Sequence, residues 1–179
     1  MLKKILIAVA VLIVGFAIVV AMQPADFRVT RSTTIAAPPA AVFAQVNDLH
    51  KWDAWSPWAK LDPNAKNSFE GPVAGVGAAM AWSGNNEVGE GRMTITESRP
   101  NEKVVFRLDF VRPFKDTSTS EFTFAPKGDQ TVVTWAMFGK NGFVGKAVGL
   151  VMNCDKMLGG YFEEGLAQLD AATITAAKR

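Results

Sequence analysis

The stretch KMLGGYFEEGLAQL, at residues 156–169, has apolar residues at helical spacing. It belongs to a longer apolar pattern with a spacing of three or four residues, which predicts one amphipathic helix from Phe143 to the end of the chain. The apolar stripe consists of Phe143, Ala147, Leu150, Cys154, Leu158, Tyr161, Gly165 and Leu169. Gly159 and Gly160 are unfavourable inside a helix, so we expect either a close packing partner or a bend there.

The region before this helix alternates between apolar and polar residues, which predicts β-strands. The first strand covers residues 27–35, and residues 103–111 show the clearest alternation, with Phe106, Leu108 and Phe110 on one face. Turns rich in Gly, Pro and Asn separate the strands. After the first strand, six more are predicted, at about 67–72, 77–83, 91–98, 103–111, 117–125 and 131–138.

Two short helical segments are predicted between the first and second strands. Val42, Phe43, Val46 and Leu49 recur at helical spacing after Pro38 and Pro39, and the segment LHKWDAWSPW follows them. We expect Pro57 to end the second segment. The resulting fold class is α+β, with a curved, seven-stranded antiparallel sheet wrapped around a long C-terminal helix. One helix does not fill the whole concave face, so we expect a ligand cavity between the sheet and the helix.

The N-terminal segment has no charged residue from Ile5 to Ala25. At about 1.5 Å per residue, a helix of this length crosses a hydrocarbon core of about 30 Å. We interpret residues 1–25 as a transmembrane anchor, crossing with residues 5–22, and residues 26–179 as the ligand-binding domain. A cleaved secretory signal is the alternative, because Lys3 and Lys4 precede the apolar run.

The same two lysines predict that the N-terminus is cytoplasmic, by the positive-inside rule. The chain is then a single-pass protein of the inner (plasma) membrane, and its domain lies outside the cytoplasm, in the periplasm of a bacterium.

Composition and charge argue against nucleic-acid binding and exclude an intrachain disulfide. Apolar residues make up 49% of the 179 residues, enough for a core of one domain. Lys and Arg number 19 against 17 Asp and Glu, and two of the lysines precede the apolar run, so the folded part is close to neutral. Nucleic acid is therefore not expected as a partner. The single cysteine, Cys154, excludes an intrachain disulfide.

No catalytic or metal-binding set stands out. His50, near Asp48 and Asp53, is a weak candidate for a general base, against a solvated surface histidine. Tyr161 is a second weak candidate, against a ring in the helix stripe whose hydroxyl bonds the backbone. Cys154 is expected to be a buried small hydrophobe. No metal-ligand spacing is present, and the Gly71–Gly77 cluster does not open a helix, so we expect neither a metal nor a cofactor.

Aromatic and apolar residues of equal parity on the strands point to the cavity wall. In the strand from residue 117, this parity continues from Phe122 into Ser120 and Ser118, which indicates a cavity with one polar end. An ordinary filled core is the alternative interpretation. The predicted pocket residues are Met80, Trp82, Phe106, Leu108, Ser120, Phe122, Trp135, Leu150, Leu158 and Tyr161.

Three tryptophans spaced three apart, Trp52, Trp55 and Trp58, admit three interpretations. They form a plug under the sheet edge, a gate over the cavity mouth, or an interfacial anchor beside the membrane.

The chain resembles the SRPBCC superfamily, the START-like or helix-grip fold, and in particular its polyketide cyclase/dehydrase-like branch. The resemblance covers about residues 27–172 and rests on AAPPAAVFAQVND at 36–48, WDAWSPW at 52–58 and KMLGGYFEEGLAQL at 156–169. It implies a helix-grip domain that binds apolar ligands, lipids among them, and it does not fix one activity.

The leading hypothesis is membrane-tethered binding of a hydrophobic or amphipathic small molecule. The alternatives are a cyclase/dehydrase-like or hydrolase-like enzyme, using His50 or Tyr161, and a protein-interaction module. The enzyme requires one of those side chains in the cavity, and the interaction module requires a collapsed cavity and an exposed apolar patch.

Overall fold

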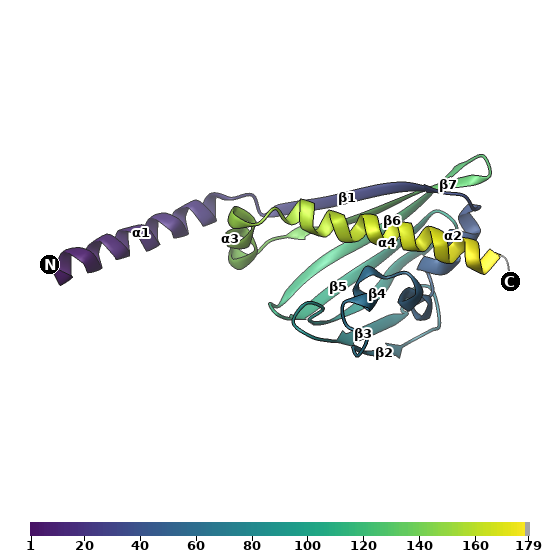
Figure 1. The fold of residues 1–179 in the computed structure, drawn as a ribbon, viewed down its shortest axis with the longest axis horizontal. Coiled ribbons are helices and arrows are strands. Elements are labelled where there is room, and N and C mark those ends of the chain that lie inside the picture. The colour runs from purple at the N-terminus through teal and green to yellow at the C-terminus, as the bar shows by residue number, and fades with distance from the viewer. Residues whose placement is uncertain (178–179) are drawn as a thin grey trace.

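The computed structural model describes residues 1–177, apart from the side chain of Cys154. A single sheet of seven antiparallel strands forms the domain, and a long helix lies across it (Figure 1). The sheet order is β1-β7-β6-β5-β4-β3-β2, so the first and last strands pair and the others follow as hairpins. The predicted fold class is confirmed. The strands are β1 Asp26–Ile35, β2 Lys66–Glu70, β3 Ala79–Ser83, β4 Glu90–Arg99, β5 Lys103–Arg112, β6 Asp116–Lys127 and β7 Gln130–Lys140.

The helices between β1 and β2 are short. Helix α2, Pro39–Val46, begins with a proline in its first turn, where the missing amide donor does no harm. It is followed by two 3₁₀ helices, η1 Leu49–Ala54 and η2 Pro57–Lys60. Pro57 therefore opens the second 3₁₀ helix as well as ending the first segment, because proline fits the first turn of a helix.

The predicted single C-terminal helix is in fact two, α3 Phe143–Val151 and α4 Cys154–Ala177. The backbone is extended at Met152, and the side chain of Asn153 accepts a hydrogen bond from the amide of Lys156 at 2.9 Å. Asparagine at this position satisfies a free amide at the start of a helix, so the sequence begins a new helix there. The expectation of one continuous helix was wrong, because Asn153 caps a second helix within the apolar pattern.

The glycine pair in α4 marks a close contact and leaves the helix unbroken. A side chain on Gly159 would overlap the guanidinium of Arg31 in β1. Arg31 donates to Asp155 at 3.1 Å and to Glu163 at 2.7 Å, so α4 is held across β1 by ion pairs on both sides of Gly159. These hydrogen bonds, first to Asp155 and then to Glu163, raise the pKa of Arg31.

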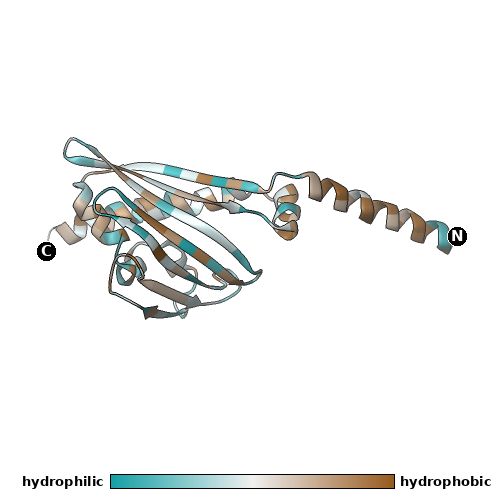
Figure 2. Ribbon diagram, turned by 180° about the vertical axis from the view of Figure 1, so that it is seen from behind, coloured by the Kyte–Doolittle hydropathy of each residue, from teal (hydrophilic) through white to brown (hydrophobic). Residues whose placement is uncertain are grey.

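Helix α1, Leu2–Met22, projects away from the domain (Figure 1). Figure 2 shows it as apolar along its length, with a hydrophilic N-terminal end. It is long and apolar enough to cross a membrane, with a mean hydropathy of 3.2 and 6% of the residues in that window buried. Of its residues, only Val20 is buried, near its C-terminal end. A helix of this length and composition is equally consistent with a signal sequence.

Candidate functional site

A cavity of about 530 Å³ lies between the concave face of the sheet and α4. This size falls in the usual range of small-molecule sites, about 300–1,000 Å³. Leu158 and Phe162 of α4 form one part of the wall, and η1, η2 and the segment from Asp62 to Asn67 form another. The sheet contributes a mostly apolar floor. Its floor residues are Met80, Trp82, Met93, Leu108, Phe110, Ser120, Trp135 and Met137.

Six of the ten predicted pocket residues line this cavity. They are Met80, Trp82, Leu108, Ser120, Trp135 and Leu158. The other four lie elsewhere. Phe106 and Phe122 are fully buried in the core, Leu150 is exposed on α3, and Tyr161 packs on α4 against Trp58, with ring centroids 6.0 Å apart.

The physical reason differs between the two phenylalanines and Leu150. Phe106 and Phe122 lie on the predicted face of the sheet. Alternation along a strand shows which side chains share a face, but it does not show which other segment covers them. Leu150 was assigned to the stripe of a single helix, and the break at Met152 and Asn153 removes α3 from that stripe.

The three tryptophans of η1 and η2 fill one end of the concave face. Trp52 and Trp55 are buried and pack edge-on against Phe122 and Trp135, with centroids 5.9–6.4 Å apart. Trp58 is partly buried and, with Trp52, lines the cavity. The burial of Trp52 and Trp55 fits the plug interpretation, and the contact of Trp58 with the cavity fits the gate interpretation. Because Trp52 and Trp55 have almost no exposed surface, the interfacial-anchor interpretation is wrong for them.

Ser120 is the polar group on the cavity floor. Its side chain is buried and accepts a hydrogen bond from the indole Nε1 of Trp135 at 2.9 Å. Trp135 is in turn held between Phe122 and Phe162, stacked at 4.7 and 4.1 Å. Gly165 allows this packing, since a side chain there would meet the indole at 2.7 Å. The serine hydroxyl is therefore fixed in position.

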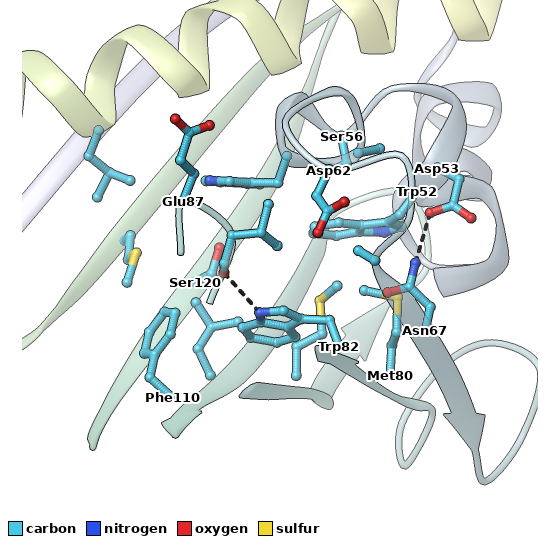
Figure 3. A pocket seen from close by; sticks show the side chains of 18 of the residues that line it. Trp52, Asp53, Ser56, Asp62, Asn67, Met80, Trp82, Glu87, Phe110 and Ser120 are labelled. Atoms are coloured by element: carbon cyan, nitrogen blue, oxygen red, sulfur yellow. Dashed lines mark hydrogen bonds between the residues drawn. The ribbon is translucent and has the colours of Figure 1, made fainter. Parts of the chain in front are cut away.

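The rim of the cavity is polar and was not predicted from the sequence. Asp53 accepts a hydrogen bond from the side chain of Asn67 at 3.2 Å (Figure 3). Asp62 accepts one from the backbone amide of Asn85 at 2.7 Å. Glu87 and Arg112 complete the charged residues among those that line the described cavity. These side chains come from loops and strand ends, where no hydrophobic periodicity marks them. The polar stretch from Asp62 onward was the one available signal.

Trp82 closes the cavity floor beside the rim. Its indole lies over Gly91, where an added side chain would approach the ring to 2.5 Å. Its Nε1 donates to the carbonyl of Val88 at 3.3 Å, and its ring meets Phe110 edge-on at 5.9 Å. The position of this large side chain thus depends on the glycine in β4.

His50 does not lie in this cavity. Its imidazole is 47% exposed, contacts Asp48 at 3.2 Å and stacks on Phe69 at 4.0 Å. Tyr161 is also absent from the cavity lining. Neither weak catalytic candidate is therefore positioned to act on a molecule held there. The expected role of Cys154 concerns a side chain outside the described residues.

Metal ligation finds no support among the described side chains, since no group of three or more His, Cys, Asp or Glu is arranged to hold an ion. The Gly71–Gly77 cluster forms the loop between β2 and β3, as its sequence position indicates. Three of its glycines have positive φ, which is typical of turns.

The family model described as "polyketide cyclase / dehydrase and lipid transport" matches residues 26–173, from the start of β1 to near the end of α4. The chain belongs to this family. It is thus an SRPBCC helix-grip domain, preceded by an apolar helix that the family match does not include. No curated protein matches the sequence.

Several solved structures share the fold. Protein CV1439 from Chromobacterium violaceum superposes with a TM-score of 0.59 at 17% identity, over 84% of this chain and 98% of the other. Ara h 8.0201 gives 0.57 at 10% identity, over 84% and 99%. The di-domain ARO/CYC StfQ of the steffimycin biosynthetic pathway gives 0.61 at 11% identity, over 87% and 53%. At these identities the likeness concerns the fold alone.

Proposed function

We propose that this chain is a membrane-tethered domain that binds one hydrophobic or amphipathic small molecule, such as a lipid, in the cavity between sheet and α4. The observation that carries this proposal is the cavity itself, about 530 Å³ with a mostly apolar wall. Domains of this family typically bind hydrophobic ligands. Burial of apolar ligand surface against Leu108, Met137 and Leu158 supplies the main driving force.

The polar groups of the cavity define the chemistry of the ligand. Ser120 uses its oxygen to accept from Trp135, and its hydroxyl hydrogen has no acceptor within residues 1–177. It is therefore free to donate to a carbonyl, ether or hydroxyl oxygen of the ligand. The charged residues at the rim are three carboxylates and one arginine, namely Asp53, Asp62, Glu87 and Arg112. The guanidinium of Arg112 already donates a hydrogen bond to the carbonyl of Gly84 at 2.7 Å. A neutral or cationic headgroup fits this rim better than an anionic one.

The tether is α1, crossing the bilayer with residues 5–22 of the helix. Its support is its length, its hydropathy and the exposure of nearly all its side chains, which need an apolar environment. By the positive-inside rule, Lys3 and Lys4 support a cytoplasmic N-terminus, with the domain on the other side of the inner (plasma) membrane. The intact mass of the purified chain tests this part, because a cleaved signal would remove the helix.

The two alternative functions have less support. An enzyme of the cyclase/dehydrase or hydrolase type lacks its candidate groups, because neither His50 nor Tyr161 lines the cavity. A protein-interaction module was expected to have a collapsed cavity, and this one is open.

The experiment compares what co-purifies with the full chain and with a cavity-filling variant, Leu108→Trp. Leu108 is partly buried and faces open space, so the larger side chain occupies the cavity with little strain on the core. The matched control is Val111→Trp, on the same strand at an exposed position. Both variants carry the same α1, so lipid bound around that helix contributes equally.

We expect solvent extraction and mass spectrometry to find a stoichiometric apolar compound with the wild type and Val111→Trp, and its loss with Leu108→Trp. Equal amounts in all three proteins would contradict binding in the cavity. A wild type with no compound, which also fails to bind added neutral amphiphiles, would contradict the proposed function.

A further inference from the structure

Helix α3 is an apolar helix without a buried residue. Its sequence, FVGKAVGLV, has five large apolar side chains, yet none of its residues is buried. Val151 is 82% exposed and Phe143 is 54% exposed, and the apolar surface continues into Met152 and Met157. The other large exposed apolar residues of residues 26–177 are spread over loops and strands. Contiguous exposed patches of this kind usually mark an interaction site.

The position of α3 indicates what covers this patch. The Nζ of Lys146 donates to the carbonyl of Ala21 at 3.3 Å, in the last turn of α1. The amide of Asn141, just before α3, donates to the carbonyl of Ala25 at 2.7 Å. Figure 1 shows α3 between α1 and the sheet, and Figure 2 shows apolar segments of α3 next to the end of α1.

The depth of α3 in a membrane follows from these contacts. Helix α1 ends at Met22 and has just the length needed to cross a hydrocarbon core of about 30 Å. Its C-terminal end therefore lies at the bilayer surface, and α3, bonded to that end, lies at the same level. Amphipathic helices at this depth bury their apolar face at the boundary between headgroups and acyl chains.

The charges around α3 complement an anionic bilayer surface. Lys140, Lys146 and Lys156 lie in or beside the helix, in a folded part that is neutral as a whole. Two carboxylates lie near these lysines: Asp155, which is already paired with Arg31 at 3.1 Å, and Asp26, which lies opposite Lys140 in the sheet. The lysines still outnumber the carboxylates that are not paired elsewhere. Lysines next to a membrane-crossing helix attract anionic headgroups.

We propose that α3 is an interfacial helix, which inserts the apolar side chains of Phe143, Val144, Leu150, Val151 and Met152 into the bilayer surface beside α1. The proposal rests on the proposed tethering by α1 and adds a second contact between the domain and the bilayer. This contact fixes the orientation of the domain. It also brings Leu158, which lines the cavity and follows the exposed Met157, within two helical turns of the membrane surface.

The test is photo-crosslinking of the full chain in vesicles of phosphatidylcholine and phosphatidylglycerol. A benzophenone amino acid replaces Val151 in α3, Ile13 in the middle of α1, or Thr175, exposed at the far end of α4, in three separate proteins. We expect lipid adducts from positions 151 and 13, and none from position 175. In vesicles of phosphatidylcholine alone, the yield at 151 should fall while that at 13 stays constant.

The outcomes separate this inference from the tether. A lipid adduct at 13 without one at 151 overturns the interfacial helix and leaves the tether in place. A crosslink from 151 to a second copy of the chain overturns it in favour of a dimer contact. The absence of lipid adducts at both positions would contradict both the proposed tether and the interfacial helix.

A charge variant provides a second measurement. With the crosslinker at Phe143, the double variant Val144→Glu and Val151→Glu should reduce the yield of lipid adduct severalfold. Its matched control, Val73→Glu and Val76→Glu, adds the same charge at exposed valines of the β2–β3 loop and should leave the yield unchanged. Equal yields in the two double variants would contradict the proposal.

Discussion

The two ends of the concave sheet face differ in what covers them. Two phenylalanines on the same face of strand β5 show this difference. Phe106 is fully buried, whereas Phe110, four residues further on, is partly exposed beside the cavity. Phe106 meets Trp52 edge-on at 5.2 Å, whereas Phe110 meets Trp82 at 5.9 Å across the open end. A phenylalanine thus lies on this face toward each end of the strand, and the covering element decides which of the two belongs to the core.

The cover of the filled end is held by backbone hydrogen bonds. The indole of Trp52 donates to the carbonyl of Val46 at 2.9 Å, and that of Trp55 to the carbonyl of Gln45 at 3.3 Å. Both acceptors lie at the C-terminal end of α2, where helix carbonyls lack partners within the helix. The tryptophans thus bury their rings without leaving their N–H groups unsatisfied. The open end has no such cover, which leaves the space for a ligand.

The largest effect is expected from Phe106→Ala at the filled end. Removing a fully buried ring leaves a void among Trp52 and Phe122, so stability should fall by about 3–5 kcal/mol. Chemical denaturation of the full chain in detergent, followed by tryptophan fluorescence, measures this. A loss below about 1 kcal/mol would mean that the two ends are packed alike.

Ser120 and Trp135 lie between the two ends of the concave face. The substitution Ser120→Ala removes the hydroxyl that accepts the hydrogen bond from the Trp135 indole. The buried N–H would then be unsatisfied, which costs about 1–3 kcal/mol. Under the proposed function, the variant also loses affinity for oxygen-containing ligands, whereas its affinity for simple alkanes stays close to that of the wild type. Denaturation and ligand titration check the two parts. Unchanged stability would show that Trp135 finds another partner.

Phe110→Ala is the counterpart of the first substitution at the open end. The ring already borders the cavity and is partly exposed, so its loss should cost only about 1 kcal/mol and enlarge the cavity. Denaturation under the same conditions gives the difference between the two phenylalanines. The comparison fails if Phe110→Ala is as destabilising as Phe106→Ala.

The smallest effect is expected at edge strand β2, beyond the open end, whose residues are all exposed. The hydrogen bond from Arg92 to Glu70, at 2.9 Å, lowers the pKa of this carboxyl. A carboxyl whose pKa is lowered on folding stabilises the folded state at pH values above its unfolded-state pKa, which is about 4.3 for glutamate. This contribution is lost as the pH falls through the folded-state pKa. Glu70→Gln should therefore be slightly less stable than wild type at about pH 7, and the difference should shrink as the pH falls below about 4. A difference that grows toward low pH would contradict this sign.

The sequence predicted the strands and their inward faces well, because alternation directly reports which side chains share a face. It did not separate Phe106 and Phe122 from Leu108, because that distinction depends on tryptophans placed by a different segment. The contact of Gly159 with Arg31 was expected only as an unnamed close approach, since the partner lies far away in the sequence. The rim residues Asp62 and Glu87 were missed because loops have no periodicity.

The most direct test of the cavity as the ligand site is ¹³C-methyl NMR of the methionines of the full chain in nanodiscs, titrated with dodecanol as a neutral amphiphile. Met80, Met93 and Met137 line the cavity, whereas Met152 and Met157 are exposed outside it, in the region proposed to contact the bilayer. We predict saturable shifts of the three cavity methyls at one equivalent, and none of them in Leu108→Trp. Shifts confined to Met152 and Met157, or cavity shifts that persist unchanged in Leu108→Trp, would contradict the account.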